Sequence, residues 1–339
     1  MASVRRRRVF SAVLVAGLLV AGCSGSDSDD GGGGDSDDAG GSTTTTTAAS
    51  TTTTVAGPTA AEVCADATLD PASPPVAEAD ITEVSGLAAS RENPAVLWMH
   101  NDSGGDPEVF AVGLDGAARG RFALEGAEAT DWEDMALGPS PGPDDDVDEL
   151  YLGDIGDNDS QRDDVTVYRV AEPTVADGDA GDRALGDVRS LTLTYADGAR
   201  DAETLLADPV TGDLFVVSKQ WDGSPAGVYR IPADAVAAPT DAPVTMERTA
   251  DATVPAGELA TGGDISADGS LIAIRTYQSV LLWDRAPDQT VGEALAGEPC
   301  KSAATSEMQG EAVAILPDAT GYITVSEGQN PPLHHFALP

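Results

Sequence analysis

Short runs of apolar and β-branched residues follow one another along residues 83–339, and polar turn residues separate them. Residues 208–213 and 267–270 combine aspartate with glycine just before the apolar runs at 214–217 and 271–274. Turn residues placed between such runs are typical of β-hairpins. Because helical periodicity is hard to find in this part of the chain, the pattern predicts an all-β domain.

One short pattern, in which a small or acidic residue opens a run of small and aliphatic residues, occurs five times. The copies are residues 83–87, 131–137, 201–206, 263–266 and 309–315. From Glu83 through Glu133, Glu203 and Asp264 to Glu311, the steps are 50, 70, 61 and 47 residues. This spacing suits one propeller blade per copy and predicts a five-bladed β-propeller. The alternatives are a six-bladed ring, in which the longest repeat is split, and an array of β-sandwiches.

The last repeat contains three strands before the sequence reaches Pro339. We expect an N-terminal segment around residues 79–82 to supply the missing outer strand and close the ring, which removes exposed sheet edges. Cys64 precedes the first repeat and Cys300 precedes the last. Outside the cytoplasm such a pair commonly forms a disulfide, which would join the two ends of the ring. The alternative is two buried, unpaired thiols.

Residues 1–22 have the pattern of a signal peptide. Four arginines at residues 5–8 precede an apolar stretch at 9–20, which is too short to span a membrane comfortably. Residues 19–23, Leu-Val-Ala-Gly-Cys, resemble the lipobox of bacterial lipoproteins, in which the cysteine becomes the acylated N-terminus. We expect a lipid on Cys23 to anchor the protein to the outer face of the bacterial cytoplasmic membrane. A plain secretory signal with an incidental cysteine is the alternative.

Residues 23–61 consist largely of glycine, serine, aspartate and threonine. A segment with so few apolar side chains has little to bury, and we expect it to stay disordered as a tether. The remaining residues, 62–339, are numerous enough for one large all-β domain with its own hydrophobic core.

The chain is strongly acidic, with 58 aspartates and glutamates against 18 lysines and arginines. Without the arginines at residues 5–8, which the predicted cleavage removes, 14 basic residues remain and the formal net charge is −44. Such a field repels nucleic acids and anionic membrane surfaces, and it attracts divalent cations. We therefore exclude nucleic acid as a partner.

In a propeller blade the first strand runs along the central channel and the second returns beside it. The oxygen-bearing side chains at the first-strand starts are Ser85, Glu133, Glu203, Asp264 and Glu311. Two carboxylates ~6 Å apart repel each other by about 2.8 kcal/mol at an effective dielectric of ~20, so several of them share protons, splay apart or hold a cation. Oxygen donors without sulfur or clustered histidine favour Ca²⁺. Magnesium, manganese or no metal are the alternatives.

The ends of the second strands lie at the same mouth and hold most of the chemically versatile side chains. The catalytic candidates there are His100, Asp102, Asp157, Lys219, Arg275 and Glu327. Lys219 and Arg275 could each instead pair with a neighbouring acid. Trp132 and Trp221 are expected to pack in the core or at the rim, or to line a site for a sugar or another ring.

The order of Ser, Glu, Glu, an acid and Glu at the five blade starts resembles the calcium-activated apyrases, which are soluble nucleotidases with five-bladed propellers. The matches to the first, second, third and fifth ligand positions of that family are Ser85, Glu133, Glu203 and Glu311. Asp264 departs from the family, which has a serine at the fourth position, but it still supplies oxygen. The phrases Ser-Gly-Leu-Ala and Gly-Glu-Ala are also similar to phytase-like esterases and SdiA-regulated secreted propellers.

The resemblance spans residues 83–327 and implies a central calcium and basic residues that receive phosphates. It leads to the prediction of a calcium-dependent hydrolase of phosphoesters or phosphoanhydrides. In that reaction Lys219 and Arg275 would neutralise developing charge, and one of the other four candidates would carry the proton. The partner would be a small anionic substrate or a surface glycan. The alternative is a non-catalytic binding or scaffold propeller with a structural calcium.

Overall fold

A computed structural model describes residues 57–339 except 142–146, 176–180, 239–241, 306 and 308. The predicted signal peptide, the lipidation site Cys23 and the predicted tether up to residue 56 lie outside the described residues. The chain divides into two units, Met1–Thr53 and Thr54–Pro339, and everything below concerns the second. Within the described ranges, no helix has the length and apolar character needed to cross a membrane.

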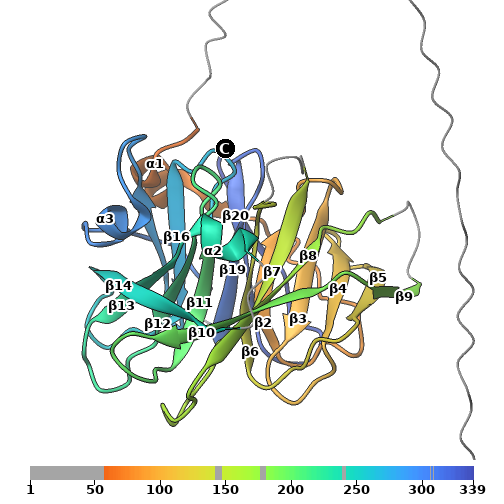
Figure 1. Cartoon of the computed structure of the whole chain (residues 1–339). Helices are drawn as coiled ribbons and strands as arrows, with labels where there is room; N and C mark the ends of the chain where they lie inside the picture. The colour runs from red at the N-terminus through yellow and green to blue at the C-terminus, as the bar shows by residue number, and fades with distance from the viewer. Residues whose placement is uncertain (1–56, 142–146, 176–180, 239–241, 306, 308) are drawn as a thin grey trace, which may run out of the picture. The chain divides into compact units, whose positions relative to one another are not determined.

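By their antiparallel pairing, the described strands other than β9 fall into five groups of four, and apart from β1 the groups follow one another along the chain (Figure 1). Group 1 contains β2 (Val84–Ala89), β3 (Val96–Asn101), β4 (Glu108–Gly113) and β5 (Ala118–Leu124). Group 2 contains β6 (Trp132–Pro139), β7 (Asp148–Asp154), β8 (Val165–Ala171) and β10 (Arg189–Tyr195). Group 3 contains β11 (Ala202–Ala207), β12 (Leu214–Ser218), β13 (Ala226–Ile231) and β14 (Val244–Ala252).

Group 4 contains β15 (Ala260–Ile265), β16 (Leu271–Thr276), β17 (Val280–Asp284) and β18 (Cys300–Ser302). Group 5 contains β19 (Gly310–Ile315), β20 (Gly321–Ser326), β21 (His334–Ala337) and β1 (Thr68–Leu69). Strand β9 (Asp182–Leu185) pairs in parallel with β5, and β10 pairs in parallel with β14, which joins groups 2 and 3 into one sheet. The helices are short: α1 (Ala60–Asp66), α2 (Ala233–Ala237) and α3 (Val291–Leu295).

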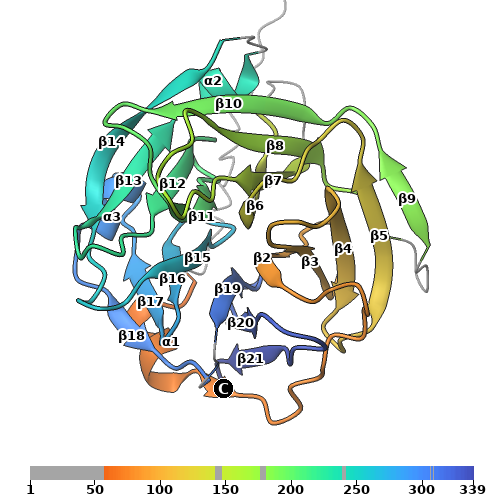
Figure 2. The same cartoon turned by 90° about the horizontal axis from the view of Figure 1, so that it is seen from below.

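The first strand of each group, called the inner strand below, lies nearest a common centre (Figure 2). These inner strands contact one another in succession, β2 with β6, β6 with β11, β11 with β15, β15 with β19, and β19 with β2. The predicted all-β class is confirmed, and the arrangement is propeller-like.

The core lies between neighbouring groups. Five buried hydrophobic clusters each take residues from two adjacent groups. In one of them Tyr151 of group 2 packs in the same cluster as Leu205 of group 3, and in another Phe215 of group 3 joins Ile272 of group 4. Because burying one large aliphatic or aromatic side chain contributes about 1.5–3 kcal/mol, these shared clusters hold the groups together around the centre.

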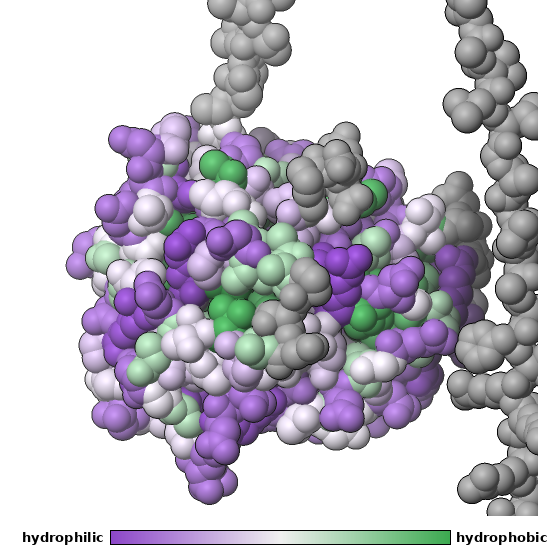
Figure 3. All heavy atoms as spheres, in the orientation of Figure 1, coloured by the Kyte–Doolittle hydropathy of each residue, from purple (hydrophilic) through white to green (hydrophobic). Residues whose placement is uncertain are grey.

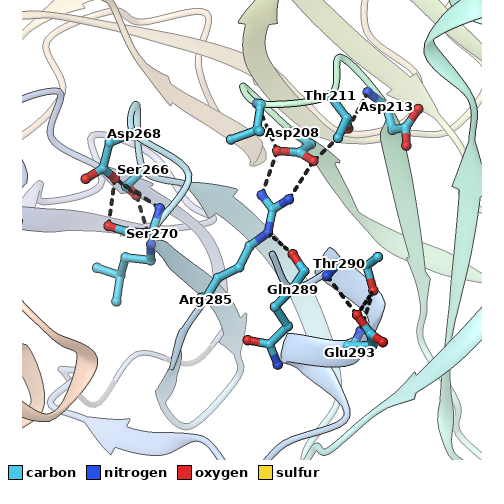
Figure 4. A network of polar contacts seen from close by, with 12 residues as sticks. Asp208, Thr211, Asp213, Ser266, Asp268, Ser270, Arg285, Gln289, Thr290 and Glu293 are labelled. Carbon is cyan, nitrogen blue, oxygen red and sulfur yellow. Dashed lines mark hydrogen bonds and ion pairs between the residues drawn. The ribbon is translucent and has the colours of Figure 1, made fainter. Parts of the chain in front are cut away.

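A buried ion pair also joins groups 3 and 4 at the end of the molecule where β11 turns into β12 (Figure 4). Arg285 donates from Nη1 to Oδ1 of Asp208 at 2.7 Å and from Nη2 to Oδ2 at 3.0 Å. Its Nε donates to the carbonyl oxygen of Gln289 at 2.8 Å. Asp208 in turn accepts from the hydroxyl of Thr211, so the carboxylate fixes its own turn as well as the neighbouring group.

The strand that completes group 5 is not the one expected. Thr68 and Leu69 of β1 pair with Ala337 and Phe336 of β21. The predicted segment, residues 79–82, begins with a turn instead.

The side chain of Asn101 holds that turn. Its Oδ1 accepts from the backbone N–H groups of Thr82 and Glu83 at 3.0 and 3.1 Å, and its Nδ2 donates to the carbonyl oxygen of Asp80 at 2.8 Å. The side-chain amide of Asn101 thus satisfies backbone N–H and C=O groups that would otherwise pair with a neighbouring strand.

The predicted disulfide between Cys64 and Cys300 is confirmed, with Cα atoms 6.3 Å apart and a sequence separation of 236. Cys64 lies in α1 and Cys300 in β18, so the bond ties the segment before the first inner strand to the outer edge of group 4. The contact of α1 with β17 and β18 supports the same attachment.

Candidate metal centre

The second residue of each inner strand lies at a shift in the pairing register with the following strand. The five residues are Ser85, Glu133, Glu203, Thr261 and Glu311. A bulge of this kind leaves one residue unpaired and turns its side chain away from the regular alternation of the strand. Four of the five, all except the threonine, line one common cavity. The structure therefore brings four of the five predicted ligand residues together.

Asp264 is the exception, and its predicted place at the centre is wrong. It lies three residues beyond the bulge of β15, where its Oδ2 accepts from the N–H of Ile315 at 2.7 Å and braces β15 against β19. The equivalent bulge residue is Thr261, whose hydroxyl donates to the carbonyl oxygen of Gly310 at 2.9 Å. Asp264 was predicted as the ligand because the residue at the bulge itself, Thr261, has no carboxylate.

The cavity has a volume of about 190 Å³ and a predominantly polar lining. Its described lining residues are Ser85, Asp102, Glu133, Asn158, Glu203, Lys219, Trp221, Tyr277, Gln309, Glu311 and Glu327. Five of these are carboxylates and one is a cation. Asp102, Lys219 and Glu327 thus lie where the sequence placed them, at the mouth formed by the second-strand ends.

Two sets of acidic side chains bring their oxygens close enough to share one ion. Asp102, Asp131 and Glu133 have carboxylate oxygens within 4.8 Å of one another, and so do Glu133, Asp201 and Glu203. Glu133 belongs to both sets and is the centre of the cluster. Asp131 and Asp201 were not among the predicted ligands. Each stands two residues before a bulge glutamate, and this shared Asp-x-Glu spacing was the signal that could have found them.

The end of β7 holds the backbone of Asp131 in place. Its backbone N–H donates to Oδ1 of Asp154 at 3.2 Å, and the same carboxylate pairs with Arg162 at 2.8 Å.

Asp201 is held in a similar way. Its Oδ1 accepts from the N–H of Asp157 at 3.0 Å, and its Oδ2 accepts from the indole N–H of Trp221 at 3.3 Å. Asp157 itself accepts from the N–H groups of Gln161 and Arg162, both at 2.8 Å. It therefore organises its loop and is not among the described residues that line the cavity, contrary to its predicted catalytic placement.

The electrostatics of the cluster disfavour its charged form. Burial, together with the charges of neighbouring carboxylates, raises the pKa of Glu203 and of Glu311 to about 8. Burial and the nearby Glu203 also raise the pKa of Glu133 well above its ordinary value, and burial raises that of Asp131 to about 6. A divalent cation would offset both the cost of burying these charges and the repulsion between them.

Lys219 partly offsets the negative charge. Its ammonium donates to Oε1 of Glu203 and, at 2.8 Å, to the hydroxyl of Tyr277. The sequence left open whether Lys219 pairs with a neighbouring acid, and the structure shows that it pairs with Glu203. The other oxygen of Glu203, Oε2, is buried and has no hydrogen-bond partner among the residues that the structure describes. One carboxylate oxygen in the cluster is therefore left for a ligand.

His100 does not lie at the mouth. It is fully buried in β3, where its Nδ1 donates to the carbonyl oxygen of Asn101 at 2.8 Å and its ring meets Trp132 edge-on. Burial lowers its pKa to about 4. In the register of group 1, His100 stands opposite Gly86, and a Cβ at that glycine would collide with the imidazole. The absent side chain is the reason why the ring can turn inward.

Arg275, near the end of β16, also turns inward beside a glycine. It is fully buried and pairs with Glu307 at 2.5 Å. A Cβ at Gly310 would collide with its guanidinium, so this glycine also makes room for the inward side chain. Neither Arg275 nor His100 is among the described lining residues of the cavity, and their predicted catalytic placement is wrong.

The donor chemistry of the cavity fits a hard cation. Its candidate ligands are carboxylate, hydroxyl and amide oxygens, and the described lining includes neither histidine nor cysteine. Such oxygens suit calcium, magnesium or manganese, whereas zinc and copper prefer nitrogen or sulfur. The acidic cluster could therefore hold a metal ion.

No family model and no curated protein matches this chain. Similar solved structures include a gluconolactonase from Xanthomonas campestris, with 15% identity, a TM-score of 0.42, and coverage of 76% of this chain and 72% of that chain. A chain of a nidogen–laminin complex has 16% identity, a TM-score of 0.40 and coverage of 73% of both chains. At these values the likeness carries no argument about activity or ligand. The resemblance to apyrases and phytase-like esterases stays a prediction.

Proposed function

We propose that the domain is a five-bladed β-propeller in which the five groups are the blades and β1 closes the last one. The ring of contacts among the inner strands supports this reading, because it returns from β19 to β2. The bulge at the same position of every inner strand supports it as well, since equivalent modules around one axis repeat their local geometry.

At the axis we propose a calcium site. The observation that carries the proposal is the pair of acidic sets that share Glu133, in each of which one oxygen per residue lies within 4.8 Å of the others. The ligands would be drawn from Glu133, Glu203, Asp131 and Asp201, with Asp102 at the mouth side. Calcium accepts about six to eight oxygens in flexible geometry, which suits a cluster built from several loops and bulges.

Beside this site lie groups that can stabilise charge and move a proton. Bound calcium would polarise a substrate oxygen and lower the pKa of a coordinated water. Lys219 and Tyr277 present N–H and O–H donors to the same cavity, where negative charge would develop on the substrate oxygen. Burial raises the pKa of Asp102 and of Glu327, which makes each carboxyl easier to protonate and suits a proton carrier.

The substrate class that fits this site best is an uncharged carboxylic ester. The phosphoester prediction came from the resemblance to apyrases, with Lys219 and Arg275 as the cations that would neutralise developing charge, and the structure buries Arg275 away from the cavity. Among the described lining residues Lys219 is the one cation that faces five carboxylates. With Lys219 as the one cationic side chain, a dianionic phosphate would have less stabilising charge than the sequence predicted, whereas the carbonyl of an ester needs less.

We further propose that a lipid on Cys23 holds the domain at the outer face of the cytoplasmic membrane. The lipobox sequence supports this proposal. A disulfide between Cys64 and Cys300 is consistent with it, because disulfides persist in oxidising compartments.

The test is a panel of p-nitrophenyl acetate, γ-butyrolactone and p-nitrophenyl phosphate, each offered to the purified full chain with calcium and with EDTA. We expect turnover of the carboxylic esters that EDTA abolishes and calcium restores. Lys219→Met should lower kcat by about 10- to 100-fold. Arg119→Met is the matched control, because it removes an exposed cation that pairs with Asp115, and it should leave kcat unchanged.

Two results would contradict the proposal. Calcium-dependent turnover of the phosphate ester alone would restore the phosphoester prediction. Calcium binding without turnover of any ester would favour the non-catalytic propeller with a structural calcium.

A further inference from the structure

Trp221 differs from the other tryptophans of the chain. Trp98, Trp132 and Trp283 are buried, whereas Trp221 is 61% exposed. It follows the end of β12 and lines two hollows, the axial cavity and an adjoining groove of about 510 Å³. An exposed indole at the junction of two hollows is placed to contact a ligand that extends from one to the other.

The ring of Trp221 is held in place in spite of its exposure. Its indole N–H donates to Oδ2 of Asp201 at 3.3 Å, and Nζ of Lys219 lies 4.9 Å from the ring centroid. The first contact fixes the rotation of the ring, and the second adds a cation–π attraction. Because the orientation is set before a ligand arrives, little conformational entropy is lost on binding.

The groove lies between the loop from β12 to β13 and the segment from β14 to β15 (called the Trp221 groove below). Pro225, Val254, Pro255 and Leu259 give it apolar walls. Gln220 and Ser224 add amide and hydroxyl groups, whereas the hydroxyl of Ser218 is buried and accepts from the N–H of Gly227 at 2.8 Å. The lining thus combines a flat aromatic ring and apolar walls with a few polar groups, as ligand sites commonly do.

The Trp221 groove offers no free charge among its described lining residues. Glu258 is the one lining residue that ionises, and its Oε1 pairs with Lys301 at 2.6 Å. Its Oε2 accepts from the hydroxyls of Thr276 and Ser279 at 2.6 and 2.5 Å. With this carboxylate already satisfied, an uncharged ligand fits the groove better than an ionic one.

The volumes of the two hollows indicate that one substrate could occupy both. The axial cavity, at about 190 Å³, has room for an ion and a small reacting group, whereas pockets for whole small molecules span ~300–1,000 Å³. The Trp221 groove, at about 510 Å³, falls in that range and shares Trp221 with the cavity. A substrate that reacts at the axis would therefore place its remaining part in the groove.

We propose that the Trp221 groove binds an uncharged sugar ring, the non-reacting part of a saccharide ester. The inference rests on the proposed function as far as the ester is concerned, but the sugar contact itself needs no metal. The C–H face of a pyranose packs on an indole, and its hydroxyls can donate to and accept from the side chains of Gln220 and Ser224, which share a hydrogen bond of 2.9 Å. A bare aromatic hydrocarbon offers no such hydrogen bonds.

The test is saturation-transfer NMR of the purified full chain, with cellobiose and adenosine as probes, in EDTA and in calcium. We expect cellobiose signals in both buffers, at least about tenfold weaker binding in Trp221→Ala, and partial recovery in Trp221→Phe. Val210→Ala is the matched control. Val210 is also 61% exposed but lies in the turn from β11 to β12, at the other end of the hairpin, and its replacement should change nothing.

The outcomes separate this inference from the proposed function. Cellobiose binding that depends on Trp221, without calcium-dependent ester turnover, would support the groove and contradict the hydrolase. Calcium-dependent turnover without cellobiose signals would contradict the groove alone. Signals from adenosine only, or equal cellobiose signals from wild type and from a folded Trp221→Ala protein, would also overturn the sugar site.

Discussion

The ammonium of Lys219 donates to Oε1 of Glu203 inside the protein, where the two side chains are 3% and 7% exposed. Lys219 offsets part of the negative charge of the five carboxylates among the described lining residues, and Oε2 of Glu203 is left without a partner in the described part of the chain. The carboxylates, Glu203 included, can lower their repulsion further by binding protons or a cation. The metal-free protein should therefore respond to pH in a specific way.

In EDTA, thermal stability should increase as the pH is lowered from 8 to 6.5. Glu203 and Glu311 have folded-state pKa values of about 8, above the ordinary 4.5, so in this window the folded state binds more protons than the unfolded state. The free energy of unfolding then rises as the pH falls, by on the order of a few kcal/mol. Melting curves in EDTA at intervals across the window measure this, and a melting temperature that falls with the pH would contradict it.

Below pH 6.5 an opposing effect begins. The folded-state pKa of His100 is about 4, below its ordinary 6.5, so the unfolded state binds the additional proton in this range. Stability contributed by neutral His100 is lost as the pH falls from 6.5 towards 4. The effect of the carboxylates on stability is therefore best measured between pH 8 and 6.5, where His100 contributes little.

Gly86→Ala should destabilise the fold by about 1–3 kcal/mol, because the new methyl group would collide with the buried ring of His100. Urea unfolding measures the change. Gly186→Ala is the control, since the atom nearest to its added Cβ would be 3.9 Å away. Equal effects of the two substitutions would show that His100 is not packed against Gly86 as described.

Arg285→Ala should cost about 3–5 kcal/mol, because it leaves the buried carboxylate of Asp208 without its bidentate partner. Arg119→Ala removes an exposed arginine paired with Asp115 and should cost less than about 1 kcal/mol. Chemical denaturation compares the two. A cost at Arg285 no larger than at Arg119 would mean that the pair does not join groups 3 and 4.

Much of the fold could be predicted from the sequence, because hairpin turns and apolar runs are local signals. The turn at Asp208 and the strand after it lie where the pattern placed them. The closing strand could not be located in this way. Residues 68–69 pair with β21, whereas hydrogen bonds from Asn101, which lies in β3, hold residues 82–83 outside any strand pair with group 5.

The site was predictable where a side chain follows the backbone repeat and unpredictable where packing decides. Glu133 and Glu203 occupy equivalent bulges and were found from the repeat. Asp264 was predicted at the centre because it is an acid close to the bulge of β15. The bulge residue itself, Thr261, lies three residues before it. The inward turn of Arg275 depends on a glycine of the neighbouring group, Gly310, which sequence spacing does not reveal.

The most direct test of the account is a calorimetric titration of the full chain with calcium. Wild type should bind one calcium at the axis with a Kd of about 1 mM or tighter. Glu133→Gln, which alters the residue common to both acidic sets, should weaken binding at least about tenfold. Glu298→Gln, which alters an exposed acid, should bind as wild type does. Absence of calcium binding by wild type, or unchanged binding by Glu133→Gln, would contradict the axial metal centre.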